Sequence, residues 1–154
     1  MDGKIFMALG LFFMASFIQV ESKLCKPPAN ENGYTMFLRQ HYDNPKTSSN
    51  DYCNAMMEMR CMTNLDPPKS KCKEKNTFIH STKNLITAVC DKAGVPLGGN
   101  LRRSTKPFSV STCKVKGDPN KHPCEYKGGR GDMREIVIAC AGKLPVHLDD
   151  TEIP

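Results

Sequence analysis

Two histidines and one lysine in this sequence are of the types needed for metal-free chemistry on a phosphate ester. Such chemistry requires a base that removes a hydroxyl proton, an acid that protonates the leaving oxygen, and a cation that stabilises the phosphorane charge. Histidine suits both proton roles, because its unperturbed pKa of about 6.5 makes both forms accessible near neutrality. The candidates are His41, His147 and Lys73. If the nucleophile is a 2′-hydroxyl of the substrate, RNA would be cleaved and DNA would not.

Lys73 belongs to the nine-residue stretch from Cys72 to His80, which we expect to be a strand. Side chains alternate between the two faces of a strand. A ligand-facing side would then hold Lys73, Lys75 and Thr77, and the opposite side Cys72, Asn76 and Phe78. One face could therefore be tied to a core while the other meets a ligand.

The two histidines fall on different expected elements. His41 completes a helical series of apolar positions that begins at Tyr34. A lone histidine at such a position is more often a hydrogen-bonded core residue than a catalyst. His147 lies on a final strand, residues 144–149, where Asp149 faces the same side and could orient its ring. The alternative is a surface His–Asp pair with no catalytic role.

The first 22 residues are typical of a secretory signal peptide, with Lys4 followed by the apolar run from Ile5 to Val20. A membrane anchor is the rival interpretation, but the sequence turns polar at once. Residues 23–154 would then form one domain of a secreted, extracellular protein.

Eight cysteines follow this leader, an even number that suits a fully paired disulfide framework in an exported chain. A zinc site is the alternative, although no C-x-x-C pair occurs. We expect no metal and no cofactor. The full chain has a net charge of +6, and removing the leader takes away one lysine and two carboxylates, which leaves +7. This surplus favours polyanionic partners, although a merely soluble basic surface would look the same.

The remaining pattern predicts an α+β fold, with three helices packed on a bent antiparallel sheet and stapled by disulfides. Helices are expected over residues 34–41, 51–62 and 81–90. Strands are expected over residues 72–80, 108–113, 124–126, 136–140 and 144–149. Residues 94–100 are expected to be a loop, and 127–132 a hairpin tip.

Three separated motifs resemble those of the pancreatic-type (ribonuclease A) superfamily. They are Phe37-Leu-Arg-Gln-His41-Tyr-Asp, Cys72-Lys-Glu-Lys-Asn-Thr-Phe78 and Pro145-Val-His-Leu-Asp149. The resemblance implies an endoribonuclease that cleaves RNA 3′ of pyrimidines through a 2′,3′-cyclic phosphate. It implies His41 as base, His147 as acid and Lys73 as the cation. The implied substrate-binding residues are Gln40, Asn76, Thr77, Leu148 and Asp149.

The resemblance also implies three disulfides, namely Cys53 with Cys113, Cys72 with Cys124, and Cys90 with Cys140. A further pancreatic bridge is missing, because residues 91–112 contain no cysteine. In lacking this bridge, the chain resembles the angiogenin-like branch of the superfamily. Cys25 and Cys61 lie outside the pattern, and we expect them to pair with each other.

Some features depart from this branch or point elsewhere. Residues 58–62 replace an arginine cluster of angiogenins, and residues 91–100 also differ. Acidic residues after His147 could weaken phosphate binding and give low turnover. The alternative function is a cationic factor, angiogenin-like or in host defence, that binds cells, membranes or polyanions. Its partners could be heparin-like polyanions or a cell-surface receptor. Arg130-Gly131-Asp132 is an integrin-type tripeptide or a plain turn. We expect a monomer.

Overall fold

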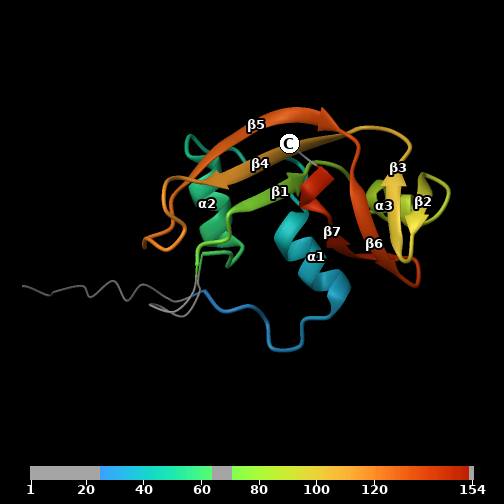
Figure 1. The fold of residues 1–154 in the computed structure, drawn as a ribbon, viewed down its shortest axis with the longest axis horizontal. Coiled ribbons are helices and arrows are strands. Elements are labelled where there is room, and N and C mark those ends of the chain that lie inside the picture. The colour runs from blue at the N-terminus through green and yellow to red at the C-terminus, as the bar shows by residue number, and fades with distance from the viewer. Residues whose placement is uncertain (1–24, 64–70, 153–154) are drawn as a thin grey trace, which may run out of the picture.

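A computed structural model describes residues 25–63 and 71–152 of the chain (Figure 1). The expected leader, residues 1–22, lies outside the described residues. Among the helices that are described, none has the length and apolar character needed to cross a bilayer.

Within the described residues, three α-helices and two short 3-10 helices pack against seven strands. The helices are α1 (Gly33–His41), α2 (Tyr52–Met59), α3 (Lys83–Thr87), η1 (Ala88–Cys90) and η2 (Asp150–Glu152). The strands are β1 (Lys75–Ile79), β2 (Gly94–Gly98), β3 (Leu101–Ser104), β4 (Phe108–Val115), β5 (Tyr126–Arg134), β6 (Val137–Ala141) and β7 (Leu144–Leu148). They form two antiparallel sheets, ordered β1-β4-β5 and β2-β3-β6-β7. The predicted α+β class is confirmed.

Helix α1 begins at a capping box. The Asn32 side chain accepts a hydrogen bond from the Thr35 backbone N–H at 2.8 Å, and Thr35 Oγ1 accepts one from the Asn32 N–H at 3.0 Å. These bonds satisfy backbone N–H groups that have no partner inside the helix. Gly33 lets α1 lie close on β7, since a Cβ there would come 3.0 Å from Val146 Cγ1. At the other end of the helix, His41 is buried.

Two apolar clusters pack on opposite faces of β1. Phe78 belongs to the cluster under α2, where Met56 and Met57 are also fully buried. Ile79 belongs to the cluster that contains residues of α1, α3, β4, β6 and β7. Neighbouring strand residues point to opposite faces, so β1 is held from both sides. The strand that carries Thr77 is therefore fixed by packing on each face.

Four disulfides join distant parts of the chain. The pairs are Cys53–Cys113, Cys72–Cys124, Cys90–Cys140 and Cys25–Cys61. These are the pairs expected from the sequence. The first three attach α2 to β4, the segment before β1 to the segment before β5, and η1 to β6. The fourth, which we call the arm disulfide, attaches the N-terminal arm to Cys61, two residues after the end of α2.

The expected hairpin tip over residues 127–132 is wrong, because these residues lie inside the long strand β5. Their glycines were the reason for expecting a turn. In the structure Gly128 and Gly129 have φ values of +103° and +85° and accompany a register shift between Ser111 and Cys113 of β4. The glycines thus form a bulge within the strand pair rather than a chain reversal.

The expected loop over residues 94–100 is also wrong in part, because Gly94–Gly98 form the edge strand β2. Pro96 lowers the strand signal in the sequence. Proline is tolerated at a sheet edge, where one side of the strand needs no ladder hydrogen bonds. The expected third helix over residues 81–90 is divided into α3 and the 3-10 turn η1.

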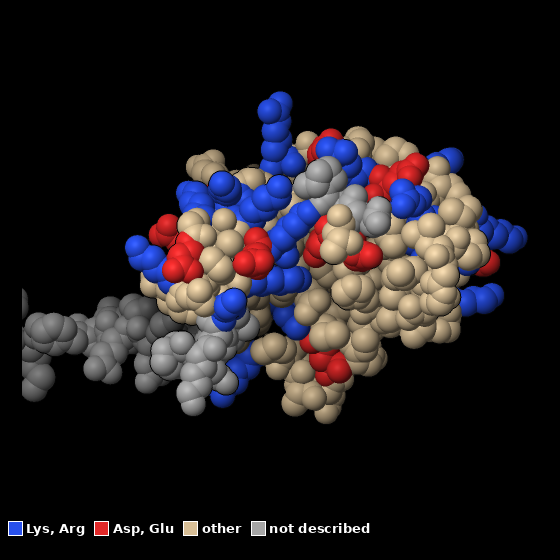
Figure 2. Space-filling model, viewed as in Figure 1, with Lys and Arg blue, Asp and Glu red and all other residues tan. Residues whose placement is uncertain are grey.

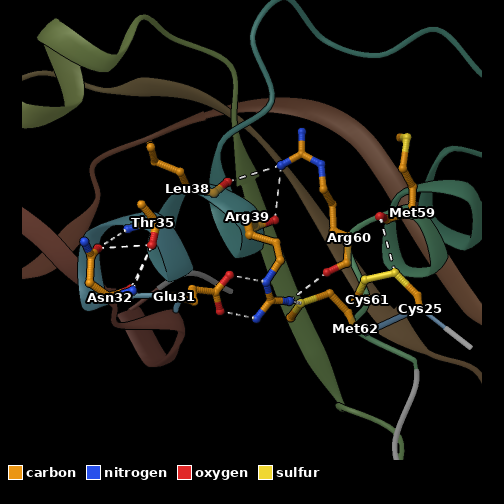
Figure 3. Close-up of polar contacts among 10 residues, drawn as sticks. All are labelled: Cys25, Glu31, Asn32, Thr35, Leu38, Arg39, Met59, Arg60, Cys61 and Met62. Atoms are coloured by element: carbon orange, nitrogen blue, oxygen red, sulfur yellow. Dashed lines mark hydrogen bonds and ion pairs between the residues drawn. A yellow bond between two sulfur atoms is a disulfide. The ribbon is translucent and has the colours of Figure 1, made fainter. Parts of the chain in front are cut away.

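Two arginines link the end of α1 to the end of α2, beside the arm disulfide (Figure 3). Arg39 forms a two-point ion pair with Glu31, at 2.7 and 2.9 Å, and donates to the Arg60 carbonyl at 2.8 Å. Arg60 donates in return to the carbonyls of Leu38 and Arg39, at 3.2 and 3.1 Å. Cations at the last carbonyls of a helix stabilise that helix end. The hydrogen bonds from Arg60 therefore hold the last turn of α1, which contains His41, in place.

The arm disulfide should contribute substantially to stability, because it closes a loop with a sequence separation of 36 residues. We expect the double change Cys25→Ser and Cys61→Ser to lower the free energy of unfolding by about 3–4 kcal/mol through the larger entropy of the unfolded chain. Urea unfolding followed by circular dichroism measures this. An unchanged midpoint at an unchanged slope would contradict the assigned role.

Candidate active site

His41 ends α1 and is anchored to β1. Its Nδ1 lies 2.8 Å from the Thr77 carbonyl oxygen, and only 2% of the residue is exposed. A carbonyl oxygen can only accept, so Nδ1 must carry the proton of the neutral ring and donate it. Nε2 then has a free lone pair. The hydrogen bond therefore selects the tautomer that can act as a base.

The surroundings of His41 keep it uncharged. Burial lowers the pKa of His41 to about 3, and the positive charge of Lys73 acts in the same direction. The hydrogen bond to Thr77 raises the pKa but is outweighed, and the charges of His147 and Arg39 lower it further. His41 is thus neutral at physiological pH and ready to accept a proton.

Lys73 does not lie on β1, contrary to the sequence prediction, because the chain bends at Glu74 before the strand begins at Lys75. The bend brings Lys73 and Asn76 together, although a continuous strand would place them on opposite faces. Lys73 Nζ donates to Asn76 Oδ1 at 2.8 Å, and Asn76 Nδ2 donates to the Gln40 carbonyl at 2.8 Å. Asn76 therefore fixes the lysine relative to α1.

Thr77 faces the opposite way from Asn76 and is fully buried. Its hydroxyl lies 3.1 Å from the Thr112 hydroxyl of the neighbouring strand, and either can be the donor. We call these two residues the threonine pair. A hydroxyl that can donate or accept can match the edge of a base. The threonine pair is thus a candidate base-reading position beside His41.

His147 is exposed on β7, next to Ala139 of β6 in the register. Asp149 Oδ1 accepts hydrogen bonds from the Thr151 N–H and hydroxyl, at 3.0 and 2.6 Å. Within the described residues no hydrogen bond joins Asp149 to His147, and the influence of the ring on this carboxylate is electrostatic. Leu148 is buried in the apolar cluster that contains Ile79, so only its backbone could meet a ligand.

Asp150, at the start of η2, inserts a carboxyl group among the candidate residues. Burial raises the pKa of Asp150, while the Thr77 hydroxyl and the charges of Lys73, Lys75 and His147 lower it. Its Oδ1 is buried and has no hydrogen-bond partner among the described residues. The Lys75 ammonium donates to the Asp150 carbonyl at 3.0 Å, which holds this turn near β1. Asp150 therefore competes with a substrate phosphate for the positive charge of the site.

Both ring nitrogens of His80 form hydrogen bonds. Nδ1 donates to the Asp43 carbonyl at 2.6 Å, so Nε2 accepts from the Ser111 hydroxyl at 2.8 Å. The Asp43 carboxylate accepts from the Tyr52 hydroxyl at 2.7 Å and from Thr47 at 2.7 and 3.0 Å. This network fixes the chain immediately after α1, next to His41.

One close cluster of potential metal ligands occurs in the described part of the chain, formed by Cys72, His122 and Cys124. Its two sulfur atoms are joined in a disulfide. Zinc requires thiolates rather than disulfide sulfur, so this donor set does not fit a metal.

Three contributing residues were missed by the sequence reasoning. Thr112 was missed because its pairing with Thr77 depends on the register of two strands far apart in the sequence. Arg39 and Arg60 were missed because arginines on helices are usually solvated. The ion pair of Arg39 with Glu31 joins positions eight residues apart, outside the helical spacings that a sequence can reveal.

The chain matches the family described as pancreatic ribonuclease over residues 32–149. It is 47% identical over 122 residues to a ribonuclease of Chelonia mydas, which covers 77% of this chain and 98% of that protein. It is 43% identical over 150 residues to an angiogenin of Macaca mulatta, which covers 94% of this chain and 96% of that protein.

Solved structures agree with these matches. The green turtle egg white ribonuclease superimposes with a TM-score of 0.69 at 46% identity, covering 77% of this chain and 98% of that one. Zebrafish RNase5 superimposes with a TM-score of 0.65 at 40% identity, covering 82% and 99%. Matches of this extent, over the segments that hold both histidines and the lysine, show that the chain belongs to the pancreatic ribonuclease family.

Proposed function

We propose that the protein is a secreted, metal-independent endoribonuclease that cleaves RNA 3′ of pyrimidines through a 2′,3′-cyclic phosphate. The observation that carries this proposal is that His41 is neutral and held in one tautomer. Burial and the charges of Lys73 and His147 lower its pKa. Family membership supports the same reaction class.

In the first step, His41 Nε2 removes the proton of the ribose 2′-hydroxyl, and the 2′-oxygen attacks the adjacent phosphorus. Protonated His147 donates to the departing 5′-oxygen, which leaves as a free hydroxyl. Lys73 stabilises the additional negative charge on the phosphorane oxygens. In hydrolysis of the cyclic product, His147 takes a proton from water and protonated His41 returns one to the 2′-oxygen.

Substrate binding would also adjust the base. A phosphate anion beside His41 and Lys73 opposes the positive charge that lowers the pKa of His41 in the free protein. The base therefore becomes stronger when the scissile group is in place. The threonine pair can exchange hydrogen bonds with the base of the cleaved nucleotide, which fits a pyrimidine preference.

The second candidate function is a cationic secreted factor, angiogenin-like or in host defence, that acts mainly by binding. Relatives named angiogenin favour it, and so does the net charge of +6. Its partners would be a cell-surface receptor or heparin-like polyanions, and we expect a monomer. A His147→Ala variant discriminates the two, because it would abolish any biological effect that depends on cleavage and spare one that depends on binding alone.

Cleavage by the refolded protein should persist in excess chelator and require both histidines. His41→Ala and His147→Ala should each reduce kcat for a uridine-containing dinucleotide by about 10²–10⁴-fold, since each removes one proton-transfer group. His122→Ala, in the loop before β5, serves as the matched control and should retain activity. Substantial activity in both of the first two variants, or loss of activity in chelator, would exclude the mechanism.

Asp150→Asn should increase activity, because it removes a carboxylate that shares the charges of Lys73 and His147 while retaining the shape of the side chain. We expect kcat/KM for RNA to rise by about 3- to 10-fold, equivalent to roughly one pKa unit of electrostatic interaction. Asp91→Asn, on an exposed residue after η1, is the control for net charge. An equal effect of both changes would show that only the overall charge matters.

Acid should destabilise the fold through His41. The unfolded residue binds a proton near pH 6.5 but the folded one only near pH 3, so acidification below 6.5 favours the unfolded state. The slope should reach about 1.4 kcal/mol per pH unit for this group. We therefore expect the free energy of unfolding, measured in urea, to fall less between about pH 6.5 and pH 4.5 in His41→Gln than in the wild type. Equal losses would contradict the neutral, buried state.

A further inference from the structure

We propose that a groove between α3 and the connection from β3 to β4 binds a free single-chain amphiphile with a compact anionic head, of the class of long-chain carboxylates. We call it the α3 groove. It has a volume of about 560 Å³, which falls in the range of about 300–1,000 Å³ typical of sites for small organic ligands. None of its apolar residues belongs to the candidate active site, so this inference does not rest on the proposed function. Those residues are Leu85, Ala93, Pro107, Phe108 and Met133.

Two apolar side chains of the α3 groove are left exposed by the fold. The exposed fraction is 58% for Leu85 and 59% for Met133. Ile86, the next residue of α3, is almost fully buried, so this short helix turns one apolar side chain to the core and another to the groove. Phe108 is half-buried and packs against the apolar cluster that contains Ile79, so the groove borders directly on the core. Exposed apolar side chains that gather at one hollow are typical of a binding site.

Hydrogen bonds hold one wall of the groove, the turn between η1 and β2, in place. Thr105 donates both its backbone N–H and its hydroxyl to the Ala93 carbonyl, at 3.0 and 3.2 Å. Arg102 holds the same turn, because its guanidinium donates to the carbonyls of Val89, Asp91 and Gly94 at 2.8, 2.5 and 2.7 Å. A site that is already formed loses less conformational entropy when a ligand binds.

The remaining walls are fixed in the same way. The N–H of Leu85 donates to the hydroxyl of Thr82, the N-cap residue of α3, at 3.2 Å. The N–H of His80 donates to the Ser109 carbonyl at 2.9 Å, which joins the end of β1 to β4 beneath Phe108 in the sequence of the strand. The α3 groove is therefore enclosed by elements that are tied to one another, and it does not require a ligand to form.

Two lysines give the α3 groove a positive charge. Lys92 and Lys106 line it and are exposed, and neither forms an ion pair within the described part of the chain. No carboxylate is among the described residues that line the groove. A lysine can lay its aliphatic stem along apolar surface while its ammonium group stays in water. Apolar walls beside two unpaired ammonium groups fit a ligand with an apolar tail and an anionic head.

A free amphiphile fits this site better than a bilayer or a protein. Helices that bind a bilayer present a continuous apolar face to it, whereas α3 has five residues and its exposed leucine lines a hollow. A stable protein partner covers about 20–30 residues, more than line the α3 groove. A single alkyl chain needs only a concave apolar surface of limited size.

Much of the positive charge of the protein lies elsewhere. Figure 2 shows Lys and Arg side chains gathered over α2 and the adjoining parts of β1, β4 and β5, whereas the surface over β2, β3 and β6 is largely uncharged. The two lysines of the α3 groove are a small part of the 22 Lys and Arg residues of the chain. A matched loss of charge from β4 and β5 can therefore separate local recognition from general attraction of anions.

Calorimetric titration of the folded, disulfide-bonded protein with decanoate, below the concentration at which decanoate forms micelles, tests the proposal. Each buried methylene strengthens binding by up to about 4-fold. Dodecanoate, with two more methylenes, should therefore bind about 4- to 15-fold more tightly than decanoate. Decyltrimethylammonium has the same alkyl chain with a cationic head, and it should bind at least about 10-fold more weakly because the two lysines repel it.

A change to the apolar wall should weaken binding without disturbing the fold. Met133→Gln should weaken decanoate binding by about 3- to 10-fold, because it replaces an apolar contact with a polar side chain of similar length. Met59→Gln, at the end of α2, is the matched control, because Met59 is 55% exposed and lies outside the groove. This control should bind decanoate as the wild type does.

A change to the charge of the groove should act on the head group. Lys92→Gln with Lys106→Gln should weaken decanoate binding by about 3- to 10-fold, the loss expected from two exposed ion pairs. Lys114→Gln with Lys127→Gln removes the same charge from exposed positions of β4 and β5 and should leave the affinity unchanged.

Several results would overturn the proposal. Equal weakening in the two double variants would leave only diffuse charge attraction, and wild-type affinity in Met133→Gln would place decanoate elsewhere. Binding to vesicles of phosphatidylglycerol without binding to decanoate would indicate a membrane surface instead. A dimer that is detected by sedimentation and dissociates in Met133→Gln would make the groove an interface between two copies of the chain.

Discussion

The hydrogen bond from His41 to the Thr77 carbonyl is the interaction on which the rest of the site depends. It joins the last residue of α1 to the central strand and decides which nitrogen carries the proton. The same strand carries Thr77, whose hydroxyl forms the threonine pair with Thr112. One backbone carbonyl thus connects the candidate proton acceptor with the candidate base-reading position.

Because His41 is the last residue of α1, its position relies on contacts that hold this helix in place. Asn76 connects α1 to Lys73, Arg60 caps the end of α1, and the arm disulfide retains the segment before it. The Asp150 carboxylate acts in the opposite sense, because it places a negative charge beside the positive charges of Lys73 and Lys75.

Three of the disulfide pairs were implied by the family resemblance, and the fourth joins the two cysteines that lie outside that pattern. The fold class and the helix and strand that carry the two histidines could be predicted from the sequence, since they depend on local periodicity and motifs. The relation of Lys73 to Asn76 could not, because a bend before β1 cancels the alternation that a continuous strand would impose. Thr112 depends on strand register, which tertiary packing sets. The glycines at 128 and 129 resemble a turn in sequence, yet their positive φ values serve a bulge inside β5.

The most direct measurement is the protonation and tautomeric state of His41, followed by nitrogen-15 NMR of the imidazole ring as a function of pH. The account predicts a neutral ring with the proton on Nδ1 down to well below pH 6.5, since burial and the charge of Lys73 oppose protonation. A ring that titrates at its ordinary pKa, or that carries its neutral proton on Nε2, would contradict the central role of the bond to Thr77.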